Sequence, residues 1–143
     1  MTPEGRIKKQ IKKLLDKYKG PVYYHMPVQN GMGRPTLDFI GWAAGVAFAI
    51  EAKAPDGRLT KRQRLTITEM ADAGCNVFVI KDQFSLDHFN VWLDMVLQTA
   101  ASGASAVVKT ASQIIAMENC GFKVSRPVFE FVAESEGHTS CKS

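Results

Sequence analysis

The chain has 143 residues, of which 45% are hydrophobic and 22% charged, which is ordinary for a globular protein with one buried core. No apolar run approaches the roughly 18 residues that a bilayer span needs, and the lysine-rich start lacks the apolar segment of a signal peptide, so we expect a soluble, cytoplasmic protein. The formal charge of +4 is uneven, since residues 1–70 carry 13 Lys and Arg against 6 Asp and Glu, which suggests an anionic partner such as nucleic acid or an acidic lipid surface.

The first predicted element is a helix that begins at Thr2-Pro3 and ends before Gly20-Pro21. Threonine is a favoured N-cap, and proline suits the first helical position because an N–H has no partner there. Apolar residues recur at helical spacing on one side: Ile7, Ile11, Leu14, Leu15 and Tyr18. The other side carries lysines: Lys8, Lys9, Lys12, Lys13 and Lys17. They form either an ordinary solvated face or a face that contacts phosphate groups.

Three strand-like runs follow the helix, over residues 22–26, 37–42 and 46–52. A loop with two glycines and a proline, residues 29–35, separates the first run from the second. Only Ala43-Ala44-Gly45 separates the second run from the third, and this connection is short enough for a hairpin.

A second helix is predicted to begin after Thr60. Gln63 stands three residues later, at the spacing of a capping box. The helix should run to about Ala73, because Gly74 offers a left-handed C-terminal stop. Residues 76–80 are nearly all apolar, as in a strand that is buried on both faces.

A further helix is predicted with Ser85 as its N-cap, and its buried stripe is Phe89, Trp92, Leu93, Val96 and Leu97. Small residues after position 99 suggest a linker or a frayed helix end, followed by an amphipathic stripe over 107–115 and a disordered polar tail over 134–143. We therefore predict an α/β core with a mixed sheet flanked by helices in residues 1–98, and a partly helical extension in residues 99–143.

The hairpin brings charged residues together. With Ala44-Gly45 at its tip, counting outward along both strands places Asp38 opposite Glu51. Lys53 lies two residues beyond Glu51 and therefore projects from the same face. Two opposed acids repel each other unless a cation lies between them, and carboxylate oxygens suit a hard cation such as Mg²⁺. Such a metal activates water and offsets charge on a phosphate, while Lys53 would orient or deprotonate the water.

Each member of this cluster also has a plainer explanation. A Glu-x-Lys tripeptide is common on exposed strand faces, and only its register with Asp38, the apolar flanking strands and the nearby Gln63 favour a site. Glu4 shares the apolar face of the first helix, which suggests that it reaches the metal, but an acid is favoured at any helix N-terminus. Gln63 either serves its capping box alone or also bridges Lys53 or a phosphate.

Other polar residues carry weaker signals. Gly31-Met32-Gly33 is not a phosphate loop, because no Gly-Lys-Ser/Thr follows it, and Arg34 beside it is either solvated or a phosphate contact. The chain has three histidines, His25, His88 and His138, and three cysteines, Cys75, Cys120 and Cys141, and none of them is spaced as a zinc ligand. We expect the cysteine thiols to be reduced.

Taken together, these segments resemble the PD-(D/E)xK nuclease superfamily and, within it, the VRR-NUC (virus-type replication-repair nuclease) family, particularly its compact stand-alone phage members. The similarity covers about residues 3–82 and rests on Asp38-Phe39-Ile40, Phe48 to Pro55, Leu59-Thr60 with Gln63, Ala73-Gly74 and Val77 to Ile80. One position departs from the family pattern, which has proline immediately before the aspartate, whereas here two residues separate Pro35 from Asp38.

The resemblance implies a restriction-endonuclease-like core and an endonuclease that uses Mg²⁺ or Mn²⁺ to cut branched or otherwise structured DNA. Stand-alone members are similar to Holliday-junction resolvases and tend to be homodimers, and a phage-encoded member would act in the host cytoplasm. Two alternatives remain: a less selective nuclease of the same superfamily, and a DNA-binding module without turnover. The retained charged positions favour an enzyme, because a pure binding module does not need two opposed carboxylates.

The resemblance also assigns roles by position. It makes Asp38, Glu51 and the backbone carbonyl of Ala52 the metal ligands, Lys53 the catalytic lysine, Glu4 the acid of the first helix and Gln63 the helix glutamine. The candidate DNA contacts are Lys8, Lys12, Arg34, Lys61 and Arg62.

Overall fold

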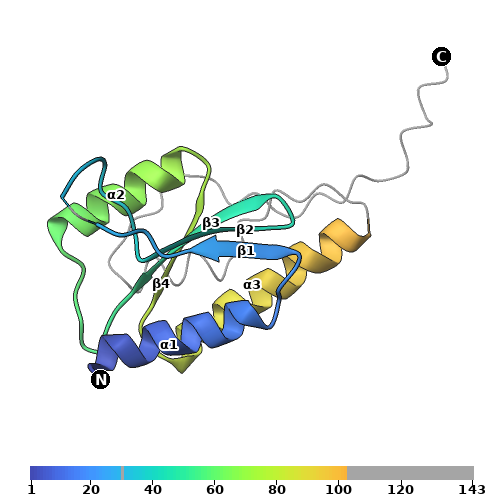
Figure 1. Cartoon of the computed structure of the whole chain (residues 1–143), viewed down its shortest axis with the longest axis horizontal. Coiled ribbons are helices and arrows are strands. Elements are labelled where there is room, and N and C mark those ends of the chain that lie inside the picture. The colour runs from blue at the N-terminus through green and yellow to red at the C-terminus, as the bar shows by residue number, and fades with distance from the viewer. Residues whose placement is uncertain (30, 103–143) are drawn as a thin grey trace, which may run out of the picture.

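The computed structural model describes residues 1–29 and 31–102, and Figure 1 shows how their helices and strands are arranged. In chain order these elements are α1 (Pro3–Asp16), β1 (Val22–His25), β2 (Phe39–Ala43), β3 (Val46–Ala52), α2 (Lys61–Asp72), β4 (Asn76–Ile80) and α3 (Gln83–Ala101). The helix predicted over 107–115 and the tail predicted over 134–143 lie outside the described residues.

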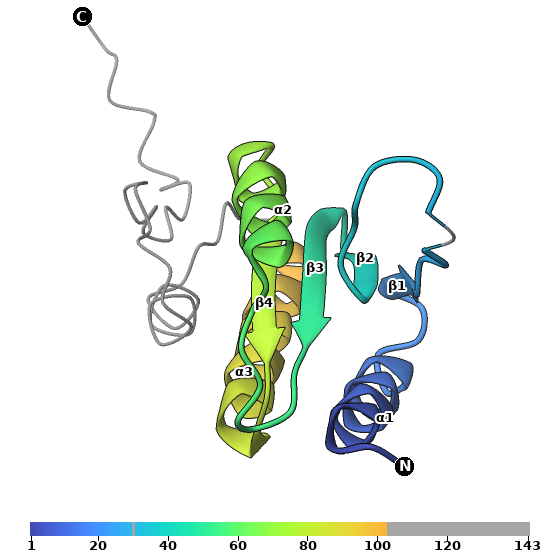
Figure 2. The same cartoon turned by 90° about the vertical axis from the view of Figure 1, so that its left-hand side faces the viewer.

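The four strands form one mixed sheet in the order β1-β2-β3-β4. β2 is antiparallel to both β1 and β3, whereas β3 and β4 are parallel and point the same way in Figure 2. A parallel pair needs a long crossover connection, and α2 provides it between β3 and β4. The prediction of a mixed α/β fold with helices flanking the sheet is therefore confirmed.

The hairpin between β2 and β3 has its tip where the sequence predicts it. Ala44 has φ 47° and Gly45 has φ 83°, and two-residue hairpin turns of this kind require positive φ at both central residues. The turn sets the register of the whole pair, which runs from Ala43 opposite Val46 to Phe39 opposite Ile50.

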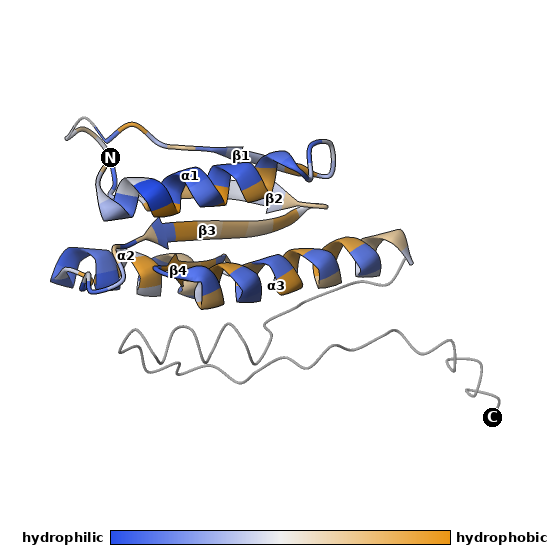
Figure 3. Ribbon diagram, turned by 90° about the horizontal axis from the view of Figure 1, so that it is seen from below, coloured by the Kyte–Doolittle hydropathy of each residue, from blue (hydrophilic) through white to orange (hydrophobic). Residues whose placement is uncertain are grey.

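Helices cover the sheet on two sides and create two apolar clusters. The larger cluster joins α1 and α3 to one face of the sheet, and its largest fully buried side chains include Trp92, Phe39, Phe48 and Phe89. Figure 3 shows β3, coloured as apolar along most of its length, running between α1 and α3. The smaller cluster packs α2 against the other face, through Leu37, Ala49, Leu59, Ile67, Val77 and Val79.

The helix caps agree with the sequence at two of the three N-termini. The Thr2 side chain accepts a hydrogen bond from the Gly5 N–H at 3.1 Å, and Thr60 and Gln63 complete a reciprocal capping box. The third prediction is wrong, because Asp82, rather than Ser85, is the N-cap of α3. Ser85 is the third residue of the helix, and it belongs to the same capping box as the partner of Asp82.

The last described helix passes the predicted domain boundary between residues 98 and 99, because α3 continues through Ala101. Its buried stripe includes four of the five predicted residues, Phe89, Trp92, Leu93 and Val96. The stripe begins earlier, at Ser85 and Leu86, and the predicted Leu97 is half-buried. None of the helices in residues 1–29 and 31–102 is long and apolar enough to cross a membrane.

Candidate active site

The two opposed acids lie where the strand register puts them. The outermost pair of β2 and β3 is Phe39 opposite Ile50, so the next residues outward, Asp38 and Glu51, face each other. Glu51 is only 4% exposed, although it is a carboxylic acid. Asp38 Oδ2 accepts a hydrogen bond from the Ala52 N–H at 2.9 Å, which fixes the carboxylate against the end of β3.

The loop before Asp38 is anchored despite the displaced proline. Leu37 is fully buried in the apolar cluster under α2, so the residue immediately before Asp38 has a fixed position. The Gln29 side chain also donates to the Thr36 carbonyl at 2.7 Å and closes the base of the loop. Asp38, which immediately precedes β2, is therefore held in place even though Pro35 lies three residues earlier.

Lys53 projects to the same place, as predicted. Its Nζ lies 3.4 Å from Glu51 Oε1, and its side chain is 12% exposed. The backbone N–H of Lys53 donates to the Ile80 carbonyl at 2.9 Å, so the residue is held by β4 just beyond the end of β3. The ammonium group is therefore positioned on the outer side of the acid pair.

Gln63 completes its predicted capping box and makes a second contact in the site, which is with Glu51 and not with Lys53. Its Oε1 accepts a hydrogen bond from the Thr60 N–H at 2.9 Å, which is its part of the capping box. Its Nε2 donates to Glu51 Oε1, so the first turn of α2 is joined directly to the buried acid. The amide thus orients the carboxylate, and its partner is Glu51 rather than Lys53.

Lys8 occupies a position that sequence periodicity does not reveal. Its Nζ lies 2.8 Å from Asp38 Oδ1 and 2.9 Å from Glu4 Oε1, and its side chain is 29% exposed. Burial acts to lower the pKa of Lys8, but hydrogen bonds and charges from Asp38 and Glu4 outweigh burial and raise it above its ordinary value. Glu4 is therefore brought to the site, but through the ammonium of Lys8. The spacing of Glu4 and Lys8, one helical turn apart, is the only signal in the sequence for this pair.

The electrostatics of Glu51 follow from this arrangement. Burial is the largest cause that raises its pKa, and the neighbouring charge of Asp38 adds to it. Lys53 and Lys8 act in the opposite direction, and the resulting pKa is about 7. In the metal-free protein, one of the two opposed acids is thus close to half protonated at neutral pH.

The donor set fits a divalent cation of the Mg²⁺ type. Within residues 1–29 and 31–102 there is no group of three His, Cys, Asp or Glu residues able to hold a metal. Mg²⁺, however, is commonly held by one or two carboxylates, with waters and substrate phosphates completing its shell. A cation bound between Asp38 and the buried Glu51 would relieve the electrostatic repulsion between the two carboxylates. Ala52 lies against Asp38 through its N–H, and its carbonyl as a ligand stays a prediction.

The predicted DNA contacts are spread more widely. Lys12, Lys61 and Arg62 are exposed, on α1 and on the first turn of α2. The Arg34 side chain is 83% exposed and reaches across from its loop to Glu69 on α2, with a nitrogen–oxygen distance of 3.5 Å. Lys8 differs from the others because it is already engaged by two carboxylates.

The arrangement as a whole can hold a cation, position a water and compensate a developing negative charge. It combines a carboxylate pair, a lysine within ion-pair distance of it and an amide that orients one carboxylate. Comparisons with known proteins add nothing to this geometry: no family model, no curated protein and no solved structure matches the chain.

Proposed function

We propose that this chain is a Mg²⁺- or Mn²⁺-dependent DNA endonuclease with a restriction-endonuclease-like core, of the VRR-NUC kind, that hydrolyses phosphodiester bonds in branched DNA. One observation carries the proposal: Glu51, 4% exposed, lies opposite Asp38 with Lys53 at 3.4 Å. Burying Glu51 beside a second, half-buried acid costs stability, and clusters of this kind gather at functional sites, where a metal or substrate can relieve the repulsion.

Each residue of the site has a separate role in the proposed reaction. Asp38 and Glu51 would hold the cation, which when bound supplies an activated water and charge stabilisation at the phosphate. Lys53 would hold that water in line with the scissile phosphorus and offset the negative charge that develops on the phosphate oxygens. Gln63 keeps Glu51 in one orientation, because it is itself fixed by the capping box of α2.

A second function has one observation in its favour. Lys8 already neutralises Asp38, as expected of a DNA-binding module that keeps the fold without turnover. The pair of opposed acids, of which Glu51 is buried, weighs against this alternative, because binding DNA does not require carboxylates. Metal dependence separates the two functions.

The direct test is a panel of labelled four-way junction, flap, linear duplex and single-stranded DNA, incubated with Mg²⁺, Mn²⁺ or EDTA. Paired symmetric cuts in the junction, only with metal, are the expected result, and they would agree with the homodimer proposed from the family resemblance. Degradation of all four substrates would show instead a less selective nuclease and would refute the preference for branched DNA. Binding without cleavage under either metal would leave only the DNA-binding module.

The position of Lys8 leads to a prediction about metal affinity. Its ammonium takes up an oxygen of Asp38 that a cation would use, so the metal must displace it. We expect Lys8→Met to bind Mn²⁺ about tenfold more tightly than the wild type in isothermal titration without DNA, because an ion pair and a nearby positive charge are removed.

The matched control is Lys12→Met, which removes the same charge from an exposed position one turn further along α1. This control should bind Mn²⁺ with wild-type affinity. Weaker binding by Lys8→Met would show instead that Lys8 holds Asp38 in place for the metal.

A further inference from the structure

A cationic pocket lies next to the acid pair. It is formed by the loop between β3 and α2, the first turns of α2 and the end of β4, and its volume is about 240 Å³. Four of its lining residues are basic, Lys53, Arg58, Arg64 and Lys81, and one is acidic, Asp56. Pockets for drug-sized molecules start at about 300 Å³, so this one suits a single small group rather than a whole nucleotide.

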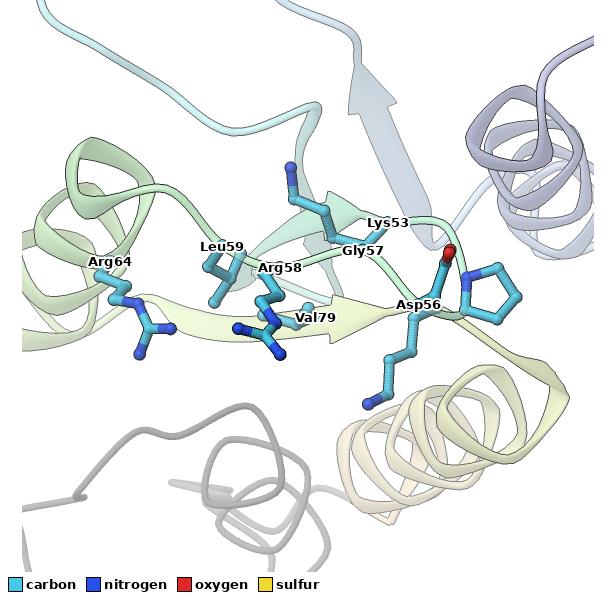
Figure 4. A pocket seen from close by; sticks show the side chains of 9 residues that line it. Lys53, Asp56, Gly57, Arg58, Leu59, Arg64 and Val79 are labelled. Atoms are coloured by element: carbon cyan, nitrogen blue, oxygen red, sulfur yellow. The ribbon is translucent and has the colours of Figure 1, made fainter.

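The two arginines of the pocket are available to a ligand. Both are exposed, and in the part of the chain that the structure describes neither forms an ion pair with an acid. Figure 4 shows that Arg58 and Arg64 extend to the same side of β4, whereas Lys53 points to the other side. The Lys53 ammonium lies 3.4 Å from Glu51 Oε1. Each guanidinium group can donate two parallel hydrogen bonds to the oxygens of a phosphate, and both groups line the same pocket.

One residue of the pocket, Lys53, also contacts the acid pair, through Glu51. Ala52 is paired with Ile80 in the parallel register, so the next residues outward, Lys53 and Lys81, are neighbours on strands about 4.8 Å apart. Lys53 already has Glu51 as its acidic partner, whereas Lys81 forms no ion pair in the part of the chain that the structure describes. A ligand in the pocket would therefore lie on the far side of Lys53 from Glu51, one side chain away from the candidate cleavage site.

We propose that this pocket binds a phosphate group of a nucleic acid strand and so fixes the strand relative to the acid pair. The proposal deepens the proposed function and rests on it for the nature of the strand. Arg58 and Arg64 would form the clamp, and Lys81 would add charge at its base. The phosphate belongs either to the continuous backbone or to a strand end.

The clamp is tested with Arg58→Gln/Arg64→Gln, which removes two charges and keeps polar side chains of similar reach. The control is Arg6→Gln/Lys19→Gln, which removes the same charge from exposed positions on α1 and just beyond its end. Binding of labelled junction DNA is measured by fluorescence anisotropy in EDTA, at several salt concentrations, so that no cleavage intervenes.

We expect the arginine variant to bind about tenfold more weakly than the control. Because both arginines hold a single phosphate, the slope of log affinity against log salt should fall by about one rather than two. Inorganic phosphate should raise the melting temperature of the wild type above that in chloride of equal ionic strength, and should not raise that of the arginine variant. An arginine variant indistinguishable from the control in affinity and slope overturns the proposal.

Two further substrates distinguish the source of the phosphate. A nicked duplex is prepared with either a phosphate or a hydroxyl at the 5′ end of the nick. If the arginine variant loses affinity equally for both, the pocket holds an internal phosphodiester. If the wild type prefers the phosphorylated nick and the variant loses this preference, the pocket holds a terminal phosphate.

Failure of this proposal is separate from failure of the proposed function. Metal-dependent cleavage by the wild type together with unchanged DNA binding by the arginine variant would refute the phosphate pocket and leave the proposed nuclease function intact. DNA binding that depends on the two arginines, without cleavage in Mg²⁺ or Mn²⁺, would support the phosphate pocket and refute the proposed nuclease function.

Discussion

Glu51→Gln and Lys53→Met are each expected to lower the rate of DNA cleavage by at least about a hundredfold, while DNA binding in EDTA stays within a few-fold of the wild type. Glutamine keeps the size of Glu51 and can still accept the hydrogen bond from Gln63, but it removes a charge that would hold the cation. Methionine keeps the stem of Lys53 and removes the ammonium that lies 3.4 Å from Glu51 Oε1. The measurement is single-turnover cleavage of labelled junction DNA at saturating Mg²⁺.

Matched controls for these variants lie on the surface. Glu69→Gln makes the same chemical change on α2, at a side chain 47% exposed whose pair with Arg34 is worth little. Lys17→Met makes the same change at an exposed position that follows α1. Both controls should cleave at the wild-type rate. Cleavage near the wild-type rate by Glu51→Gln or Lys53→Met would exclude that residue from the active site.

In the absence of metal, the free energy of unfolding should fall by about 3 kcal/mol as the pH rises from 4.5 to 8, on account of Glu51 alone. The pKa of Glu51 is raised from 4.5 to about 7, by burial first and by the charge of Asp38 second, with Lys53 and Lys8 opposing. Between these two values the native state holds a proton that the unfolded state has released. The stabilisation is therefore complete below pH 4.5 and is lost as the pH rises through 7. Urea unfolding at a series of pH values measures it.

Glu51→Gln isolates this contribution from other titrating groups, because Asp38, Lys53, Lys8 and the histidines remain in it. Its unfolding free energy should lack the Glu51 component of the decline and exceed that of the wild type at pH 8. Added Mg²⁺ should stabilise the wild type more at pH 8 than at pH 6, since the cation and the proton compete for the same carboxylate. Parallel pH profiles for the wild type and Glu51→Gln would refute the assignment of the raised pKa to Glu51.

The two large predictions depend on opposite uses of the same side chain. A carboxylate at position 51 is expected to be needed for cleavage, and it is also expected to make the metal-free protein less stable above neutral pH. A residue selected for stability alone would be the amide or an apolar side chain. Gain of stability together with loss of activity in Glu51→Gln would be the signature of a functional site.

The sequence by itself determined the parts of the site that depend on local geometry. The two-residue turn at Ala44-Gly45 and the alternation of side chains along a strand are enough to place Asp38 opposite Glu51 and Lys53 on the same face. The three-residue spacing of Thr60 and Gln63 is likewise enough for the capping box. These features follow from residue spacing because turns, strand alternation and caps involve residues that are close along the chain.

Local spacing was not sufficient at the start of α3. Asp82 and Ser85 are both good capping residues, and the sequence alone led to the second of them. The two side chains are partners in one capping box, so a helix start at either position satisfies the same pattern. The extended backbone at Asp82 decides between them, and it follows from the end of β4.

Only the tertiary structure decided which groups from distant elements join the acid pair. α1 packs so that Lys8 meets Asp38, thirty residues later in the chain, and carries Glu4 into the same network. α2 places Gln63 within hydrogen-bonding distance of Glu51, and the packing of the surrounding elements buries Glu51 and raises its pKa. The acid pair is thus set by strand register, which is local, whereas its neighbours, its burial and its charge state arise from the packing of elements far apart in the sequence, which no residue spacing encodes.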